Sequence, residues 1–87
     1  MARKRNIKPV VAPPLDARAI GQRIARNRRW RKWTQGQLAQ ATGVSRDTIV
    51  GYENGLRVPR RDTLVLLSVA LRRRIDWLLF DKRVVWK

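Results

Sequence analysis

The amino-acid sequence predicts a single all-α domain built from five short helices, and three kinds of local signal support that prediction. Apolar residues recur at helical spacing, as at Ile20 and Ile24, which lie four residues apart and therefore share one helix face. Thr34 and Gln37 have the spacing of a capping box, in which each side chain accepts a hydrogen bond from the other residue's backbone amide. Gly43 can end a helix because glycine adopts the left-handed conformation without steric cost.

The helices are expected at residues 16–32, 35–42, 45–54, 64–71 and 75–80. Asp16, Thr34 and Ser45 are the candidate N-caps, since their side-chain oxygens can accept from the free amides of a first turn. Asn54 and Gly55 supply a terminator for the third helix. The fourth helix is the most apolar segment and is expected to be nearly buried, through Leu64, Leu67, Val69, Ala70 and Leu71.

The two ends of the chain differ from the helical region at residues 16–81, which we expect to form the domain. Residues 1–15 contain no acid and three prolines, which forbid a regular helix, and this composition predicts a disordered basic arm. The basic residues of this arm are Arg3, Lys4, Arg5 and Lys8. Residues 82–87 form a short tail in which Val84, Val85 and Trp86 have strand propensity, although a strand of this length needs a partner.

The charge balance points to a polyanionic partner. Lys and Arg number 21 against 6 Asp and Glu, for a formal charge of +15, and so basic a body repels itself unless nucleic acid neutralises it. The chain has no cysteine and no histidine, which removes thiol nucleophiles, the usual zinc sites and the commonest general base. The acidic residues show no spacing typical of metal or acid–base sites. We therefore expect no enzyme, no metal and no cofactor.

The sequence also predicts a cytoplasmic protein with no membrane partner. The longest uncharged runs, such as residues 63–71, fall far short of the ~20 residues that a membrane span requires. The basic start resembles the first part of a signal peptide, but prolines interrupt the short apolar run that follows it.

A series of residues between positions 35 and 59 resembles the phage repressor and Cro-type helix-turn-helix family, also called the XRE family. The matching residues are Gln35, Leu38, Ala39, Gly43, Val44, Ser45, Ile49, Tyr52, Glu53, Asn54, Gly55 and Pro59. The likeness covers about residues 20–80, since residues 75–79 match the family's fifth helix. It implies a lambda-repressor-like DNA-binding domain and a transcriptional regulator, repressor or Cro-like, that occupies operator DNA in the bacterial cytosol or a phage-infected cell, associated with the nucleoid.

The resemblance also implies which residues touch double-stranded DNA. The helix at 45–54 would enter the major groove with its first residues at base edges, and the candidate base contacts are Ser45, Arg46, Asp47 and Val50. Arg46 is the first candidate, because its fork matches the O6 and N7 acceptors of guanine. For Asp47, accepting from a cytosine amino group, orienting Arg46 and capping the helix all stay open. Gly51 stands where relatives often place a long polar reader.

Candidate phosphate contacts surround this helix: Thr34, Gln35, Thr48, Asn54, Arg57, Arg60 and Arg61. Such contacts fix the position of a protein on the duplex without reading its sequence. Of the basic arm, two interpretations stay open: it tracks the minor groove through Arg3, Lys4, Arg5 and Lys8, or it is a solvated tail.

Other matches and departures concern structure. Arg28 and Glu53 match a pair that ties the first helix to the end of the third. Asn27 stands where relatives usually bury leucine, and Trp33 where they place a small aliphatic residue. Arg72 and Arg73 replace a glycine and an apolar residue, so we expect an extended turn or a prolonged fourth helix. We expect Trp30, Trp33 and Trp77 to be packing residues. Aromatic side chains at helical spacing more often pack against other helices than form a platform for single-stranded bases.

The oligomeric state stays open between two arrangements. In a homodimer, Val84, Val85 and Trp86 would pair across the interface, and the two reading helices would lie ~34 to 36 Å apart on a palindromic operator. In a monomer, Trp86 would fold back onto its own domain. The alternative function is an antitoxin-like or other protein-interaction module that binds DNA secondarily. A non-specific RNA or nucleic-acid binder ranks last, because it leaves Gln35 and Asn54 unexplained.

Overall fold

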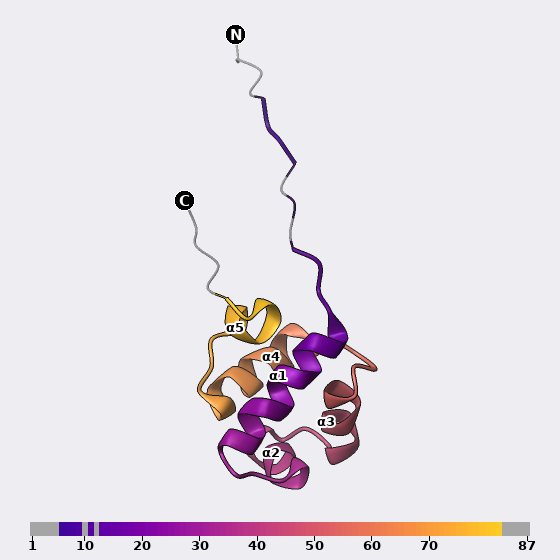
Figure 1. Cartoon of the computed structure of the whole chain (residues 1–87), viewed down its shortest axis with the longest axis vertical. Coiled ribbons are helices and arrows are strands. Elements are labelled where there is room, and N and C mark those ends of the chain that lie inside the picture. Colours follow the sequence, from indigo (N-terminus) through magenta and orange to yellow (C-terminus); the bar gives the residue numbers. More distant parts are fainter. Residues whose placement is uncertain (1–5, 10, 12, 83–87) are drawn as a thin grey trace.

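The computed structural model describes residues 6–9, 11 and 13–82 of the chain. In that part it contains five helices and no strand: α1 (Ala17–Trp30), α2 (Gln35–Thr42), α3 (Arg46–Glu53), α4 (Arg61–Leu71) and α5 (Ile75–Phe80) (Figure 1). The predicted five-helix all-α fold is therefore confirmed. The predicted tail strand with Val84, Val85 and Trp86 lies outside the described residues, as do Arg3, Lys4 and Arg5 of the arm.

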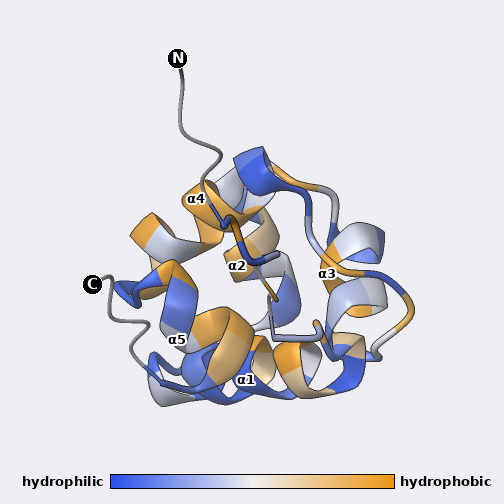
Figure 2. Ribbon diagram, turned by 90° about the horizontal axis from the view of Figure 1, so that it is seen from above, coloured by the Kyte–Doolittle hydropathy of each residue, from blue (hydrophilic) through white to orange (hydrophobic). Residues whose placement is uncertain are grey.

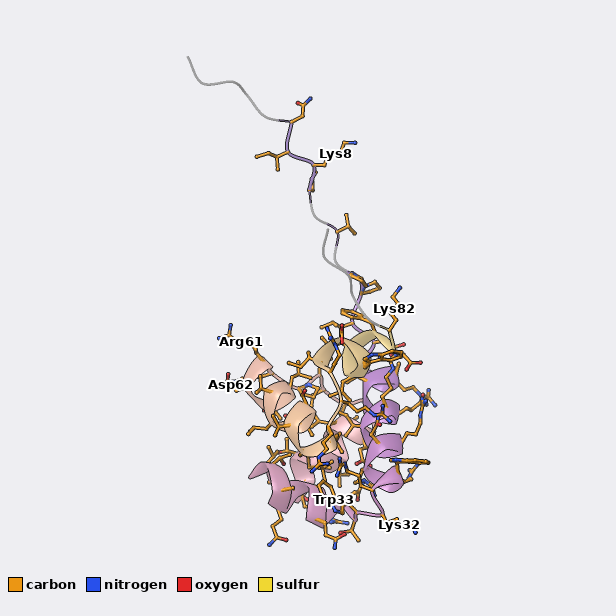
Figure 3. The ribbon with its side chains drawn as sticks, turned by 90° about the vertical axis from the view of Figure 1, so that its left-hand side faces the viewer. Lys8, Lys32, Trp33, Arg61, Asp62 and Lys82 are labelled. Atoms are coloured by element: carbon orange, nitrogen blue, oxygen red, sulfur yellow. The ribbon has the colours of Figure 1, made fainter. Side chains whose placement is uncertain are left out.

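The helices pack around α1, which contacts α3, α4 and α5, while α2 packs against α3 and α4. In Figure 1, α2 lies at one end of the domain and α5 lies towards the other, where the chain also enters α1. Figure 3 accordingly shows Lys32 and Trp33 at the α2 end and Lys82 at the opposite end. No described helix is long and apolar enough to cross a membrane.

Every helix contributes to one core. The largest fully buried side chains among the described residues are Ile20, Ile24, Leu38, Ile49, Leu67 and Leu78. Burying such a side chain stabilises the fold by about 1.5–3 kcal/mol. Helices of 6 to 14 residues are marginal or unstable alone, so each depends on this shared core.

The predicted caps are present. The Asp16 carboxylate accepts from the backbone amides of Arg18 and Ala19, at 3.1 and 3.2 Å. Thr34 and Gln37 form both hydrogen bonds of the capping box, and Gly43 has the left-handed φ of 73°. Ser45 Oγ accepts from the Thr48 amide at 3.1 Å.

The first and third helices are shorter than expected because of local backbone and capping geometry. The first helix ends at Trp30 rather than at residue 32, because Lys32 has a positive φ of 58°, which a right-handed helix cannot contain. The third helix loses only its predicted end residues, since Ser45 and Asn54 are its caps.

The expectation that the fourth helix is nearly buried is wrong. Leu64, Leu67 and Leu71 face the core, but Val69 is 72% exposed and Val65 and Leu66 are also exposed. Figure 2 shows apolar stretches along α4. The reason is geometric, because the neighbouring helices cover only one side of α4. Helix α4 also begins earlier than expected, at Arg61.

The turn between α4 and α5 is neither extended nor replaced by a longer helix. Helix α4 ends at Leu71, and Arg72 adopts the left-handed conformation that a glycine would take, with φ 52° and ψ 46°. The backbone amide of Arg73 donates to the Ser68 carbonyl, which closes the turn in the ordinary way. A side chain in this conformation costs about 1–2 kcal/mol.

Candidate nucleic-acid interface

Helices α2 and α3 are held at a fixed crossing by small and apolar residues. Leu38 and Ile49 are fully buried between them, and Ala39 is small enough to allow close approach. Gly43 and the half-buried Val44 form the turn that joins the two helices. This unit is the geometric basis of a helix-turn-helix.

The first turn of α3 presents two charged side chains to solvent. Arg46 and Asp47 are exposed, and within the described part of the chain neither has a hydrogen-bond or ion-pair partner. Asp47 therefore makes no bond that orients Arg46. Its carboxylate lies in the first turn, where a negative charge interacts favourably with the helix dipole. The Ser45 and Thr48 hydroxyls are bonded to each other at 2.7 Å, and Val50 is half-buried.

The position of Gly51 on α3 is covered by a loop side chain. An ideal Cβ at Gly51 would lie 3.5 Å from Nε of Arg57, an ordinary van der Waals distance. Arg57 therefore lies beside the place where relatives often carry a reading side chain.

Apart from Thr48, which lies within α3, the predicted phosphate contacts lie at the start of α2, at the end of α3 and in the segment that leads into α4. Gln35 is the first residue of α2, and its Nε2 donates to Glu53 Oε1 at 3.2 Å. Thr34 is an exposed cap, and Asn54 is an exposed cap at the end of α3. Arg57, Arg60 and Arg61 are all exposed, and Arg60 and Arg61 lie where α4 begins.

A buried ion pair fixes α3 to the rest of the domain. Arg28 Nε donates to Glu53 Oε2 at 2.7 Å and its Nη2 donates to Glu53 Oε1 at 2.9 Å, while Nη1 donates to the Trp33 carbonyl at 2.8 Å. The bond to the Glu53 carboxylate raises the pKa of Arg28, against the opposing effect of burial. The resemblance implied this link between α1 and the end of α3, and Gln35, on the same carboxylate, adds α2 to it.

Sequence reasoning missed Gly21, where α1 touches the end of α3. A Cβ at this position would lie 2.0 Å from the Tyr52 carbonyl oxygen and 3.0 Å from that of Glu53. Both atoms belong to the backbone and cannot move aside. The available signal was an unexplained glycine inside a helical segment, which indicates close backbone approach.

The tryptophans do not behave alike. Trp33 is partly buried against the core, with the Arg31 guanidinium 5.3 Å from its ring centre. Trp30 is 80% exposed and Trp77 is 44% exposed, so the expectation that they are packing residues is wrong for Trp30.

The basic arm is described only in part. Lys8 is exposed and lies well beyond the α5 end of the domain, away from α2 (Figure 3). This position of Lys8 does not decide whether the arm binds the minor groove or is a solvated tail.

Comparisons with known proteins agree on one family. A family model described as "Helix-turn-helix" matches residues 23–78. The P22 c2 repressor, solved with synthetic operator 9T, is 33% identical, with a TM-score of 0.71 over 72% of this chain and 96% of that one. The restriction-modification controller protein C.AhdI from Aeromonas hydrophila is 28% identical, with a TM-score of 0.70 over 74% and 97%.

A third similar structure is the biofilm master regulator SinR of Bacillus subtilis. It was solved in complex with DNA and is 28% identical, with a TM-score of 0.65 over 68% of this chain and 95% of that one. No curated protein matches the chain at a significant level.

Proposed function

This chain belongs to the helix-turn-helix family of DNA-binding transcriptional regulators, and we propose that it acts as a repressor or Cro-like protein that reads operator DNA with the first turn of α3. The observation that carries the proposal is that Arg46 and Asp47 are exposed on a capped, firmly anchored helix and have no hydrogen-bond or ion-pair partner among the described residues. Side chains placed in this way can pair with base edges without first breaking internal bonds. Ser45 and Val50 complete the proposed base-contacting set.

The proposed phosphate contacts position this helix on the duplex. Gln35 at the start of α2 and Asn54 at the end of α3 border the recognition helix at its two ends. Thr34, Thr48, Arg57, Arg60 and Arg61 would extend the contact along the backbone, and the arginines would bind phosphate through charge-assisted hydrogen bonds. We assign Lys8 and the rest of the arm to the same electrostatic attraction, which is independent of sequence.

No catalytic activity is part of this proposal. Three of the acidic side chains already serve structure: Asp16 caps α1, Glu53 pairs with Arg28, and Asp76 bonds Arg74. A cytoplasmic location on the nucleoid and a homodimer through Val84, Val85 and Trp86 remain proposals that rest on the sequence.

The experiment that tests base reading is selection of binding sites from a random duplex library at physiological salt. The native chain is compared with Arg46→Ala and with the matched control Arg26→Ala, an exposed arginine on α1 outside the helix-turn-helix. Non-specific affinity falls steeply as salt rises, so this condition separates charge from readout.

We expect one motif from the native chain and from Arg26→Ala. Arg46→Ala should lose the preference for one guanine, equivalent to about 1–3 kcal/mol, and retain salt-sensitive binding. A motif with two-fold symmetry would support the homodimer, and a single half-site would support a monomer. If no motif emerges, or if Arg46→Ala selects the native motif unchanged, Arg46 is not the base reader.

A further inference from the structure

A groove lined by arginines and tryptophans lies on the outer side of α1. It consists of two adjoining hollows of about 170 and 360 Å³, which share Arg26, Asn27 and Arg73 in their linings. Helix α1 and the segment from Arg73 to Asp81 form its walls. We call it the arginine–tryptophan groove, after Arg23, Arg26, Arg29, Arg73, Trp30 and Trp77.

Its indoles are exposed to an unusual degree. Trp30 is 80% exposed at one hollow and Trp77 is 44% exposed at the other. Exposed aromatic side chains gathered beside concave surface are typical of binding sites, because an indole gives a large contact area at little entropic cost. Among the described residues, Trp30 is not part of the hydrophobic core, and it lies on α1, outside α2 and α3.

The arginines of the groove fall into a fixed pair and an available pair. Arg23 Nη1 donates to the Leu78 carbonyl at 2.9 Å, and Arg73 Nε donates to Asn27 Oδ1 at 2.7 Å, which holds both guanidinium groups in place. Arg26 and Arg29 have no hydrogen-bond or ion-pair partner among the described residues. Asp81 is the one acidic side chain in the described lining.

The groove faces away from the recognition helix. Successive residues of an α-helix are turned by about 100° around its axis, and Gly21 marks the direction of α3 because it touches the Tyr52 carbonyl. Arg26 and Trp30 follow Gly21 by five and nine residues, which places them about 140° and 180° around α1 from that contact. Duplex DNA is stiff over roughly 150 base pairs, so a duplex held by α3 would not bend around a domain only about 20 Å across to reach this side.

We propose that the arginine–tryptophan groove binds an acidic segment of a partner protein. Carboxylates of the segment would pair with the forks of Arg26 and Arg29, and an aromatic or aliphatic side chain would lie against Trp30. Charge complementarity selects this occupant, because four arginines and one aspartate line the groove.

Other occupants fit the charge less well. A second copy of this chain carries the same charge of +15, and its six acids are scattered singly along the sequence. The chain's own end at residues 82–87 contains two lysines and an arginine and no acid. Neither supplies a segment with adjacent carboxylates.

The test begins with a random library of short peptides, selected on the full chain. Binding of the selected peptides is then measured by fluorescence anisotropy for the native chain and three variants. Arg26→Ala/Arg29→Ala removes the available arginines, and Trp30→Ala removes the exposed indole. Arg18→Ala/Lys82→Ala is the matched control, because it removes the same charge at exposed positions outside both hollows and outside the proposed DNA contacts.

We expect the selected peptides to combine acidic with aromatic residues. The Arg26→Ala/Arg29→Ala variant should bind them at least about tenfold more weakly, because it loses charge-assisted hydrogen bonds. The control variant should bind them as the native chain does. Trp30→Ala should weaken the binding of peptides that carry an aromatic residue. It should not change the binding of analogues in which alanine replaces that residue. The groove variant should keep its melting temperature and its selected duplex motif, which separates this proposal from the proposed function.

Four results would overturn the proposal. Equal weakening by the groove and control variants would show attraction to net charge alone, and peptides without acidic residues would exclude the assigned chemistry. Tighter, groove-dependent binding of a single-stranded oligonucleotide of equal charge would assign the groove to nucleic acid. A native dimer in sedimentation that Trp30→Ala dissociates would assign it to a second copy.

Discussion

Arg73 Nε donates a hydrogen bond to Asn27 Oδ1 at 2.7 Å, so two residues that depart from the family's pattern meet each other. By that resemblance, relatives usually bury leucine at the position of Asn27 and place an apolar residue at that of Arg73. Asn27 also donates from Nδ2 to the Arg23 carbonyl at 2.8 Å, which leaves its side chain satisfied at both ends. A polar contact between α1 and the turn before α5 thus stands at two positions where the resemblance leads us to expect apolar residues.

The first prediction follows from that pair. Asn27→Leu and Arg73→Leu should each lower the free energy of unfolding, and the double variant should recover most of the loss, with a coupling of about 0.5–1.5 kcal/mol. Urea unfolding of the native chain and the three variants measures the cycle. Additive losses would show that the bond contributes nothing.

The second prediction concerns the buried pair of Arg28 and Glu53. Glu53→Gln should lower the free energy of unfolding by about 3–5 kcal/mol, because the Arg28 charge stays buried without its counter-charge. The control is Arg74→Ala, which breaks the more exposed pair with Asp76 and should cost less than about 1 kcal/mol. Equal losses of unfolding free energy in the two variants would mean that burial does not increase the contribution of the Arg28–Glu53 pair to stability.

A third prediction tests the glycine contact between α1 and α3. Gly21→Ala should destabilise the domain by more than about 2 kcal/mol, because its Cβ would lie 2.0 Å from the Tyr52 carbonyl oxygen. Gly36→Ala is the control, since its Cβ would meet only Thr34 Oγ1 at 3.8 Å. That change should raise stability by up to about 1 kcal/mol. Thermal unfolding followed by circular dichroism checks both, and a stable Gly21→Ala would contradict the crossing described above.

The fourth prediction concerns a new base-contacting side chain on α3. Gly51→Gln should fold, because the nearest atom to a Cβ there is Arg57 Nε at 3.5 Å, on an exposed side chain. It should add a preference for adenine, worth about 1–3 kcal/mol, at a base pair adjacent to those that the native chain selects. Gly51→Ala serves as the control. If the selected motif does not change, position 51 does not face the duplex.

A fifth prediction uses the left-handed residue after α4. Arg72→Gly should raise the free energy of unfolding by about 1 kcal/mol, because φ is 52° there and glycine adopts it without steric cost. At Arg26, an exposed position inside α1, the same change should lower it. Opposite signs in urea unfolding are the expected outcome, and a loss at both positions would contradict the assigned backbone.

The sequence by itself determined the helices and the motif, because these depend on interactions between residues close in the chain. Thr34, Gln37 and Gly43 fix α2 through bonds that span at most a few residues, and its bounds match the prediction. The Arg28–Glu53 pair and the exposed start of α3 were predicted through the family resemblance, and the start of α3 itself was predicted from its cap at Ser45.

Only the tertiary structure decided which side of each helix is covered. Val69 and Trp30 are apolar residues at helical spacing, and periodicity cannot tell that no neighbour packs on them. The same holds for Gly21 and for the bond between Asn27 and Arg73, which join segments 31 and 46 residues apart. The physical reason is that burial and long-range pairing depend on how the helices cross, and the crossing is set by the whole core rather than by any one segment.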